Sequence, residues 1–119
     1  MNSSSALPGK IIELQRSDRT LAIHDTKTLV QTTDFRVVQI RLPAGTTIPT
    51  YEAIGEIIIH CLEGCISVVA QGSGHKLTSD QLLYLVAAEP FSISAEEDSS
   101  VIATIVSPTR GPEINVIGS

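Results

Sequence analysis

The stretch that decides the fold is "AGTTIPTYEAIGEIIIHCLEG", residues 44–64. Its second half, "EIIIHCLEG", is rich in β-branched residues and ends in Gly64, which predicts a strand followed by a tight turn. Successive side chains of a strand point to opposite faces, so the strand presents two rows: Ile57, Ile59 and Cys61 on one face, and Ile58, His60 and Leu62 on the other. Both rows are largely apolar, and we therefore expect both faces to be covered.

The rest of the chain shows the same pattern of short β-branched runs that end in turn residues. Seven further runs of apolar and β-branched residues are separated by clusters of Gly, Pro, Asp or Ser, and no window of a dozen residues has a good helical stripe. These runs are "KIIELQ", "TLVQTT", "FRVVQIRL", "CISVVAQ", "QLLYLVAA", "PFSISA" and "SVIATIVS". Turn signals recur about every ten residues, as in "QGSGH", and this spacing is typical of a sandwich or barrel. We predict an all-β barrel.

Composition narrows the possible partners. The chain has 119 residues, enough for one domain with a single core. Charged residues make up only 18% of it, against roughly 25% in typical soluble domains, so we expect part of the surface to be covered by another subunit. A net charge of -5 without a local Lys/Arg cluster argues against nucleic acid and anionic lipid as partners.

The two ends look different from the centre. "MNSSSALPGK" has neither a charged start nor an apolar core, so it does not resemble a signal peptide, and we expect a cytoplasmic protein with a flexible tail at residues 1–10. The barrel is expected over residues 11–107. Residues 108–119 end in the apolar "INVI", which we interpret as an edge strand or a dimer contact. The two cysteines are expected to be reduced thiols in this compartment.

The spacing around the opening stretch resembles that of the cupin family. The first cupin motif runs Gly, five residues, His, one residue, His, three or four residues, Glu, six residues, Gly, and Gly45 and Gly64 fit its two ends. The stretch "DQLLYLVAAEPFSISA" lies on the second motif without gaps, and it keeps the apolar pattern and Pro90 before the last ligand position. The resemblance covers residues 35–106. It implies a single jelly-roll barrel, also called a double-stranded β-helix, and commonly a homodimer formed through the sheets.

The departures from the two motifs concern the metal ligands. The positions of the two first-motif histidines fall on Tyr51 and Ala53, the glutamate position falls on Ile57, and the second-motif histidine position falls on Phe91. Three of these side chains have no donor atom, and a neutral tyrosine is a poor ligand. We therefore expect no metal and no cofactor at the family's usual site.

Without a metal, the same positions suggest an apolar pocket. Our candidate lining residues are those expected to face the barrel interior: Tyr51, Ala53, Ile57, Ile59, Cys61 and Phe91. Such a pocket disfavours unpaired charges and suits a small neutral or aromatic molecule. The Tyr51 hydroxyl could orient the ligand through one hydrogen bond, or could simply bond to a backbone carbonyl. Cys61 is expected to be structural, because no base or cation adjoins it in the sequence.

The other polar candidates are Glu56, Arg41 and the three histidines. Glu56 and His60 are expected to point away from the cavity, with His60 under a partner subunit. His24 and His75 are expected to be solvated. A zinc site from His60 and the two cysteines is disfavoured, because neighbouring strand residues face opposite ways. Arg41 could bind a carboxylate at the barrel mouth, although a solvated or dimer-surface position is the commoner outcome.

The leading hypothesis is therefore a metal-free cupin that acts as a small-molecule-binding or sensing module. Two alternatives stay open. One is a cupin enzyme, isomerase or dioxygenase-like, that uses Tyr51 or relocated ligands such as Glu56 and His60. The other is a structural or interaction protein whose barrel is filled.

Overall fold

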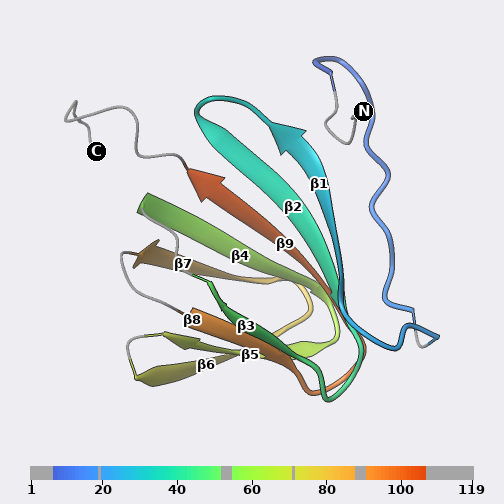
Figure 1. Ribbon diagram of the computed structural model, residues 1–119, viewed down its shortest axis with the longest axis vertical. Coiled ribbons are helices and arrows are strands. Elements are labelled where there is room, and N and C mark those ends of the chain that lie inside the picture. Colours follow the sequence, from blue (N-terminus) through green and yellow to red (C-terminus); the bar gives the residue numbers. More distant parts are fainter. Residues whose placement is uncertain (1–6, 19, 52–54, 71, 88–90, 107–119) are drawn as a thin grey trace.

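The computed structural model describes residues 7–18, 20–51, 55–70, 72–87 and 91–106 (Figure 1). These residues contain nine strands and no helix, so the all-β prediction is confirmed. The strands are β1 (Asp25–Gln31), β2 (Phe35–Leu42), β3 (Thr47–Tyr51), β4 (Gly55–Glu63), β5 (Cys65–Ala70), β6 (Ser73–Thr78), β7 (Gln81–Ala87), β8 (Phe91–Ala95) and β9 (Ser99–Val106). Within the described part of the chain, no helix could span a membrane.

The strands form two antiparallel sheets. One has five strands in the order β1-β2-β9-β4-β7, and the other has four in the order β3-β8-β5-β6. The chain passes repeatedly between the sheets: β4 and β5 are joined by a tight turn but belong to different sheets, and so do β6 and β7. Figure 1 shows the two sheets facing each other as the sides of a wedge. This two-sheet, crossing arrangement is that of a jelly roll.

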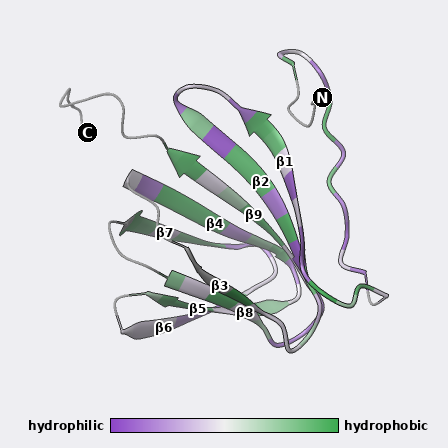
Figure 2. Ribbon diagram, viewed as in Figure 1, coloured by the Kyte–Doolittle hydropathy of each residue, from purple (hydrophilic) through white to green (hydrophobic). Residues whose placement is uncertain are grey.

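The core lies between the sheets and follows the predicted alternation. On β4, Ile57, Ile59 and Cys61 are buried, whereas Ile58 is exposed and His60 is half-buried on the opposite face. The inner rows of β2 and β9 continue this apolar layer from the five-stranded sheet, and β5 and β8 supply the facing layer. Figure 2 shows hydrophobic and hydrophilic residues following one another along the strands, and both kinds on the N-terminal segment.

Two local predictions were wrong, and one strand lies outside the predicted runs. "KIIELQ" (residues 10–15) forms no strand, because Gln15 bonds to a side chain rather than to a neighbouring strand: the Gln15 backbone N–H donates to Gln39 Oε1 at 3.0 Å. Conversely, β3 forms although it contains Pro49, which is tolerated because β3 is an edge strand. β6 forms within a segment we interpreted as a turn; only Gly72 there has a positive φ, while Gly74 lies in the strand.

The N-terminal segment is held against the five-stranded sheet by polar contacts. Gln39 Nε2 donates to the Gln15 carbonyl at 2.6 Å and to Ser100 Oγ at 2.7 Å. Two residues further along the chain, the Ser17 N–H and hydroxyl donate to the Glu63 carboxylate at 3.2 and 2.9 Å. Gln39 is almost fully buried as a result. This segment therefore covers one end of the outer face of the sheet.

Candidate functional site

Two of the four residues that align with the cupin ligand positions can be located between the sheets. Ile57 on β4 is 1% exposed and is paired with Leu85 and Ile105 in the neighbouring strands. Phe91 on β8, in the facing sheet, is 6% exposed and is paired with Ala70 and Tyr51. The Tyr51 side chain and the whole of Ala53 lie outside the described residues. Both positions that can be described are therefore buried and hold hydrocarbon side chains.

Ile59 and Cys61 continue the row from Ile57 deeper into the barrel. Both are fully buried and belong, with Phe91, to one continuous hydrophobic core. The predicted shared face of Ile57, Ile59 and Cys61 is confirmed. Their contact with a ligand stays a prediction, because at this depth the side chains pack on one another.

The two cysteines are free and buried. Cys61 Sγ lies 3.6 Å from the Glu63 carbonyl oxygen, and burial is the main cause of a raised pKa of its thiol. Burial also raises the pKa of Cys65, whose sulfur lies 3.8 Å from Glu96 Oε1. A raised pKa keeps a thiol protonated at neutral pH and therefore unreactive. Both cysteines are suited to a structural role.

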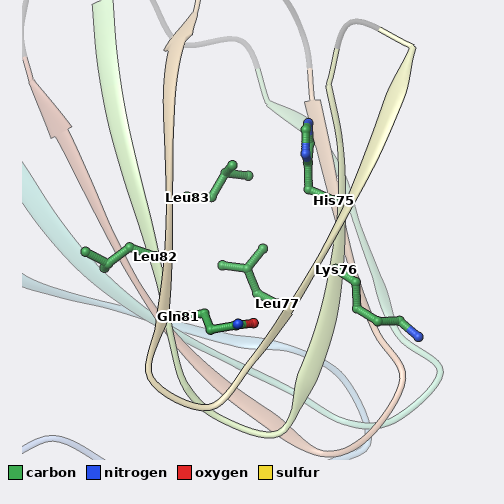
Figure 3. Close-up of a pocket in the computed structure, with 6 residues that line it drawn as sticks. All are labelled: His75, Lys76, Leu77, Gln81, Leu82 and Leu83. Carbon is green, nitrogen blue, oxygen red and sulfur yellow. The ribbon is translucent and has the colours of Figure 1, made fainter.

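A recess opens where the two sheets part, between β6 and β7. It has a volume of about 370 Å³ and is lined by His75, Lys76, Leu77, Gln81, Leu82 and Leu83 (Figure 3). In the close-up, Leu77, Leu83 and Gln81 lie between the two strands, while Leu82 and Lys76 point away from that space. The apolar floor of the recess therefore comes from Leu77 and Leu83.

His75 is the polar residue that the sequence interpretation misplaced. It shares a face of β6 with the buried Leu77 and is paired with the fully buried Val68 of β5, so it faces inward and is half-buried rather than solvated. Within the described residues its imidazole makes no hydrogen bond. The alternation of His75 with Leu77 in "SGHKLT" was the available signal, but it has meaning only once this segment is known to be a strand.

Gln81 adds a second polar group to the lining of the recess. Its Oε1 accepts hydrogen bonds from the Thr78 N–H at 2.8 Å and the Thr78 hydroxyl at 3.1 Å. Its amide nitrogen keeps its two donors for another partner. Lys76, at the rim, is engaged elsewhere, because its Nζ lies 3.2 Å from Glu96 Oε1. The recess thus combines an apolar floor with one imidazole and one amide.

Other predicted polar candidates lie away from the interior. Arg41 is paired with Asp25 at 2.9 Å on the outer face of the five-stranded sheet, so it is not a carboxylate-binding residue at the mouth. Glu56 and His60 point away from the interior, as predicted, and Glu56 Oε2 accepts a 2.8 Å hydrogen bond from the Tyr84 hydroxyl. His24 is half-buried rather than solvated.

The described residues contain no group of three His, Cys, Asp or Glu side chains arranged to hold a metal ion. The zinc site considered for His60 and the cysteines fails for the predicted reason, since His60 and Cys61 face opposite sides of β4.

No protein-family model and no curated protein matches the sequence. Solved structures do match. A conserved protein of unknown function from Streptococcus pyogenes is 18% identical, with a TM-score of 0.71 over 87% of this chain and 92% of the other. An RmlC-like cupin from Desulfovibrio desulfuricans is 22% identical, with a TM-score of 0.68 over 85% of this chain and 96% of the other. The chain has the cupin fold.

The cupin barrel also occurs within larger chains. Salicylate 1,2-dioxygenase from Pseudaminobacter salicylatoxidans is 23% identical over 71% of this chain, with a TM-score of 0.65. The matched part is only 26% of the dioxygenase chain, so our chain corresponds to about a quarter of that protein. At these identities the likeness concerns the fold of the cupin barrel and not its chemistry.

Proposed function

We propose that this chain is a cytoplasmic, metal-free cupin that binds a small neutral or aromatic molecule between its two sheets. The observation that carries the proposal is the recess between β6 and β7, where His75 and Gln81 stand over an apolar floor. Ligand sites in proteins carry a few polar groups that orient the ligand, and a volume of about 370 Å³ is within the range of sites for small organic molecules.

The absence of a metal at the family position is supported by Ile57 and Phe91. Both are buried and hold no atom that can coordinate an ion, so a metal there would lose its hydration without gaining ligands. Tyr51 and Ala53 stay predicted members of this apolar site, and neither lines the recess between β6 and β7.

The preferred charge of the ligand follows from the groups available. His75 and the Gln81 amide can donate hydrogen bonds to a hydroxyl or carbonyl oxygen. The nearest cation, Lys76, is paired with Glu96 and points away from the recess (Figure 3). A carboxylate would therefore be desolvated without a close counter-ion, which is costly. We expect a neutral alcohol to bind more tightly than the matching acid.

The test is an NMR titration of ¹⁵N-labelled protein with benzyl alcohol and with benzoate. We expect benzyl alcohol to shift the amide signals of His75, Leu77 and Leu83, with weaker shifts from benzoate. His75→Ala removes one hydrogen bond and should weaken binding by roughly 2- to 10-fold, as expected for about 1 kcal/mol. His24→Ala, which lies outside the recess, is the matched control and should bind as the wild type does.

A second candidate function is favoured by the packing deeper in the barrel. Ile57, Ile59 and Phe91 belong to one continuous core, as they would in a filled barrel whose role is interaction with another protein. The same titration separates the two candidates. If neither probe shifts any signal from the recess at millimolar concentration, the small-molecule proposal fails and the filled-barrel role is preferred.

A further inference from the structure

A glutamine on the outer face of the five-stranded sheet is almost fully buried. Gln39 alternates on β2 with the core residues Val38 and Ile40, so its side chain points away from the core, yet it is only 2% exposed. Its Oε1 accepts a bond from the Gln15 N–H at 3.0 Å, and its Nε2 donates to the Gln15 carbonyl at 2.6 Å. The buried Ser100 hydroxyl on β9 donates to the same carbonyl at 3.0 Å. These groups therefore recognise a backbone and not a particular side chain.

Glu63, at the end of β4, adds a contact two residues further along the same segment. Its carboxylate accepts bonds from the Ser17 N–H at 3.2 Å and from the Ser17 hydroxyl at 2.9 Å. Arg16 also lies 3.6 Å from Glu63, but its side chain is 84% exposed, and such ion pairs contribute little. Recognition at this point therefore includes the side chain of the serine.

A hollow lies beside these contacts. It has a volume of about 240 Å³ and is lined by Leu14, Gln15, Arg16, Leu62 and Glu63. Leu14 contributes to its wall but stays 47% exposed, so the hollow has room for a longer apolar side chain at that position. Sheets that bind extended peptides combine main-chain hydrogen bonds with pockets for side chains. The outer face of the five-stranded sheet offers the same combination.

We propose that the surface formed by Gln39, Ser100 and Glu63 is a binding site for an extended peptide with an apolar residue three positions before a serine or threonine. Residues 14–17, which we call the strap, occupy this site as an internal ligand that such a peptide displaces. The site does not depend on the small-molecule proposal, because the recess lies between the sheets and the strap lies outside them.

The way in which the strap is held makes it displaceable. Residues 10–18 form no strand, helix or turn, so detaching the strap breaks no pairing in the sheet. Leu14, Gln15 and Arg16 are all exposed, so little additional apolar surface would enter water. The next turn is self-contained, because the Thr20 N–H and hydroxyl donate to Asp18 Oδ1 at 2.9 and 2.6 Å. This turn can act as a hinge between the strap and β1.

The first test opens the site in the full chain. Gln15→Pro removes the N–H that bonds to Gln39, and Ser17→Ala removes the hydroxyl that bonds to Glu63. Both residues lie in the strap, so the double variant should keep the far-UV spectrum of the barrel. The probe is a fluorescein-labelled peptide with the sequence of residues 10–18, "KIIELQRSD". The double variant should bind it more tightly than wild type by about 10-fold or more, because two lost hydrogen bonds weaken the competing strap.

Matched peptides and variants test the recognition. A peptide with the same two substitutions, Gln15→Pro and Ser17→Ala, should bind about 10-fold more weakly than the probe. A peptide with Leu14→Ser should also bind more weakly, since it places no apolar side chain in the hollow. Adding Glu63→Gln to the double variant should weaken probe binding by about 3- to 10-fold, because hydrogen bonds to a carboxylate are stronger than those to an amide. Glu56→Gln is the control, because Glu56 bonds to a side chain of β7 instead.

Hydrogen exchange of the unsubstituted chain gives an independent measurement. The Gln15 and Ser17 amides should exchange together, faster than the central amides of β4 by about 100-fold or more, because the strap opens without global unfolding. Exchange as slow as that of β4 would overturn the proposal, since the strap would then detach only when the barrel unfolds. Equal binding of the probe by wild type and the double variant would also overturn it, and so would binding that Glu63→Gln leaves unchanged.

Discussion

Replacing Gly64 by alanine is expected to lower the free energy of unfolding by about 3 kcal/mol or more. Gly64 joins β4 to β5 and has a φ of +96°, a region that side chains with a Cβ rarely adopt. The added Cβ would also lie 2.5 Å from the Asp98 carbonyl oxygen and 2.8 Å from Ser99 Cα, and would collide with Ser99 Oγ. Two of these contacts are with backbone atoms, which cannot rotate away.

The collision would disturb a buried hydrogen-bonded corner. Ser99 Oγ accepts a bond from the Cys65 N–H at 3.1 Å and donates to the Glu97 carbonyl at 2.7 Å, and Ser99 itself is fully buried. Moving Ser99 therefore leaves polar groups without partners between the sheets.

Urea denaturation measures the effect of Gly64→Ala, and Gly45→Ala is the matched control. Gly45 has a similar φ of +84° but nothing within 4 Å of its added Cβ, so it reports backbone strain alone, about 1 kcal/mol. If the two substitutions lower the free energy of unfolding equally, the close approach of Gly64 to Ser99 is not a feature of the folded protein.

The second large effect is expected from a pair of neighbouring isoleucines. Ile59→Ala should cost about 2–5 kcal/mol, because Ile59 is fully buried and its removal leaves a cavity. Ile58→Ala should cost less than about 1 kcal/mol, because Ile58 is 37% exposed on the opposite face of β4. The two variants delete the same atoms from adjacent positions, so their difference reports burial alone.

Urea midpoints for both variants, with unchanged slopes, give the comparison directly. Should the two substitutions cost the same, or Ile58 more, the register of β4 would be wrong by one residue. A one-residue shift would exchange the inner and outer rows and remove Ile57 from the former metal position.

The sequence predicted β4 well because its two rows and its terminal glycine are local signals. β6 was missed for the opposite reason: the two glycines in "QGSGH" resemble a turn, and only pairing of β6 with β5 makes Gly74 part of a strand. The strand prediction for "KIIELQ" was wrong because a high strand propensity does not supply a neighbouring strand to pair with. Within the chain, Gln15 meets the side chain of Gln39 instead.

The predicted pocket residues do not line the recess, and their contact with a ligand stays a prediction. The apolar character of Ile57 and Phe91 followed from motif spacing, and their burial agrees with it. The recess could not be predicted, because it depends on how far β6 and β7 diverge after they leave the same turn for different sheets. His75 faces inward because it shares a face of β6 with the buried Leu77. In the sequence, only the polar neighbours of His75 were available as evidence, and we therefore predicted that His75 is solvated.

The central claim is that the cupin barrel has lost its metal site. Native mass spectrometry of the untagged protein, purified without a chelator and desalted, tests this claim most directly. We predict a species without bound metal, with or without a small organic adduct, because Ile57 and Phe91 offer no ligand atoms. One metal ion per chain that survives desalting would contradict the account. It would make Glu56 and His60 the first residues to substitute in a search for relocated ligands.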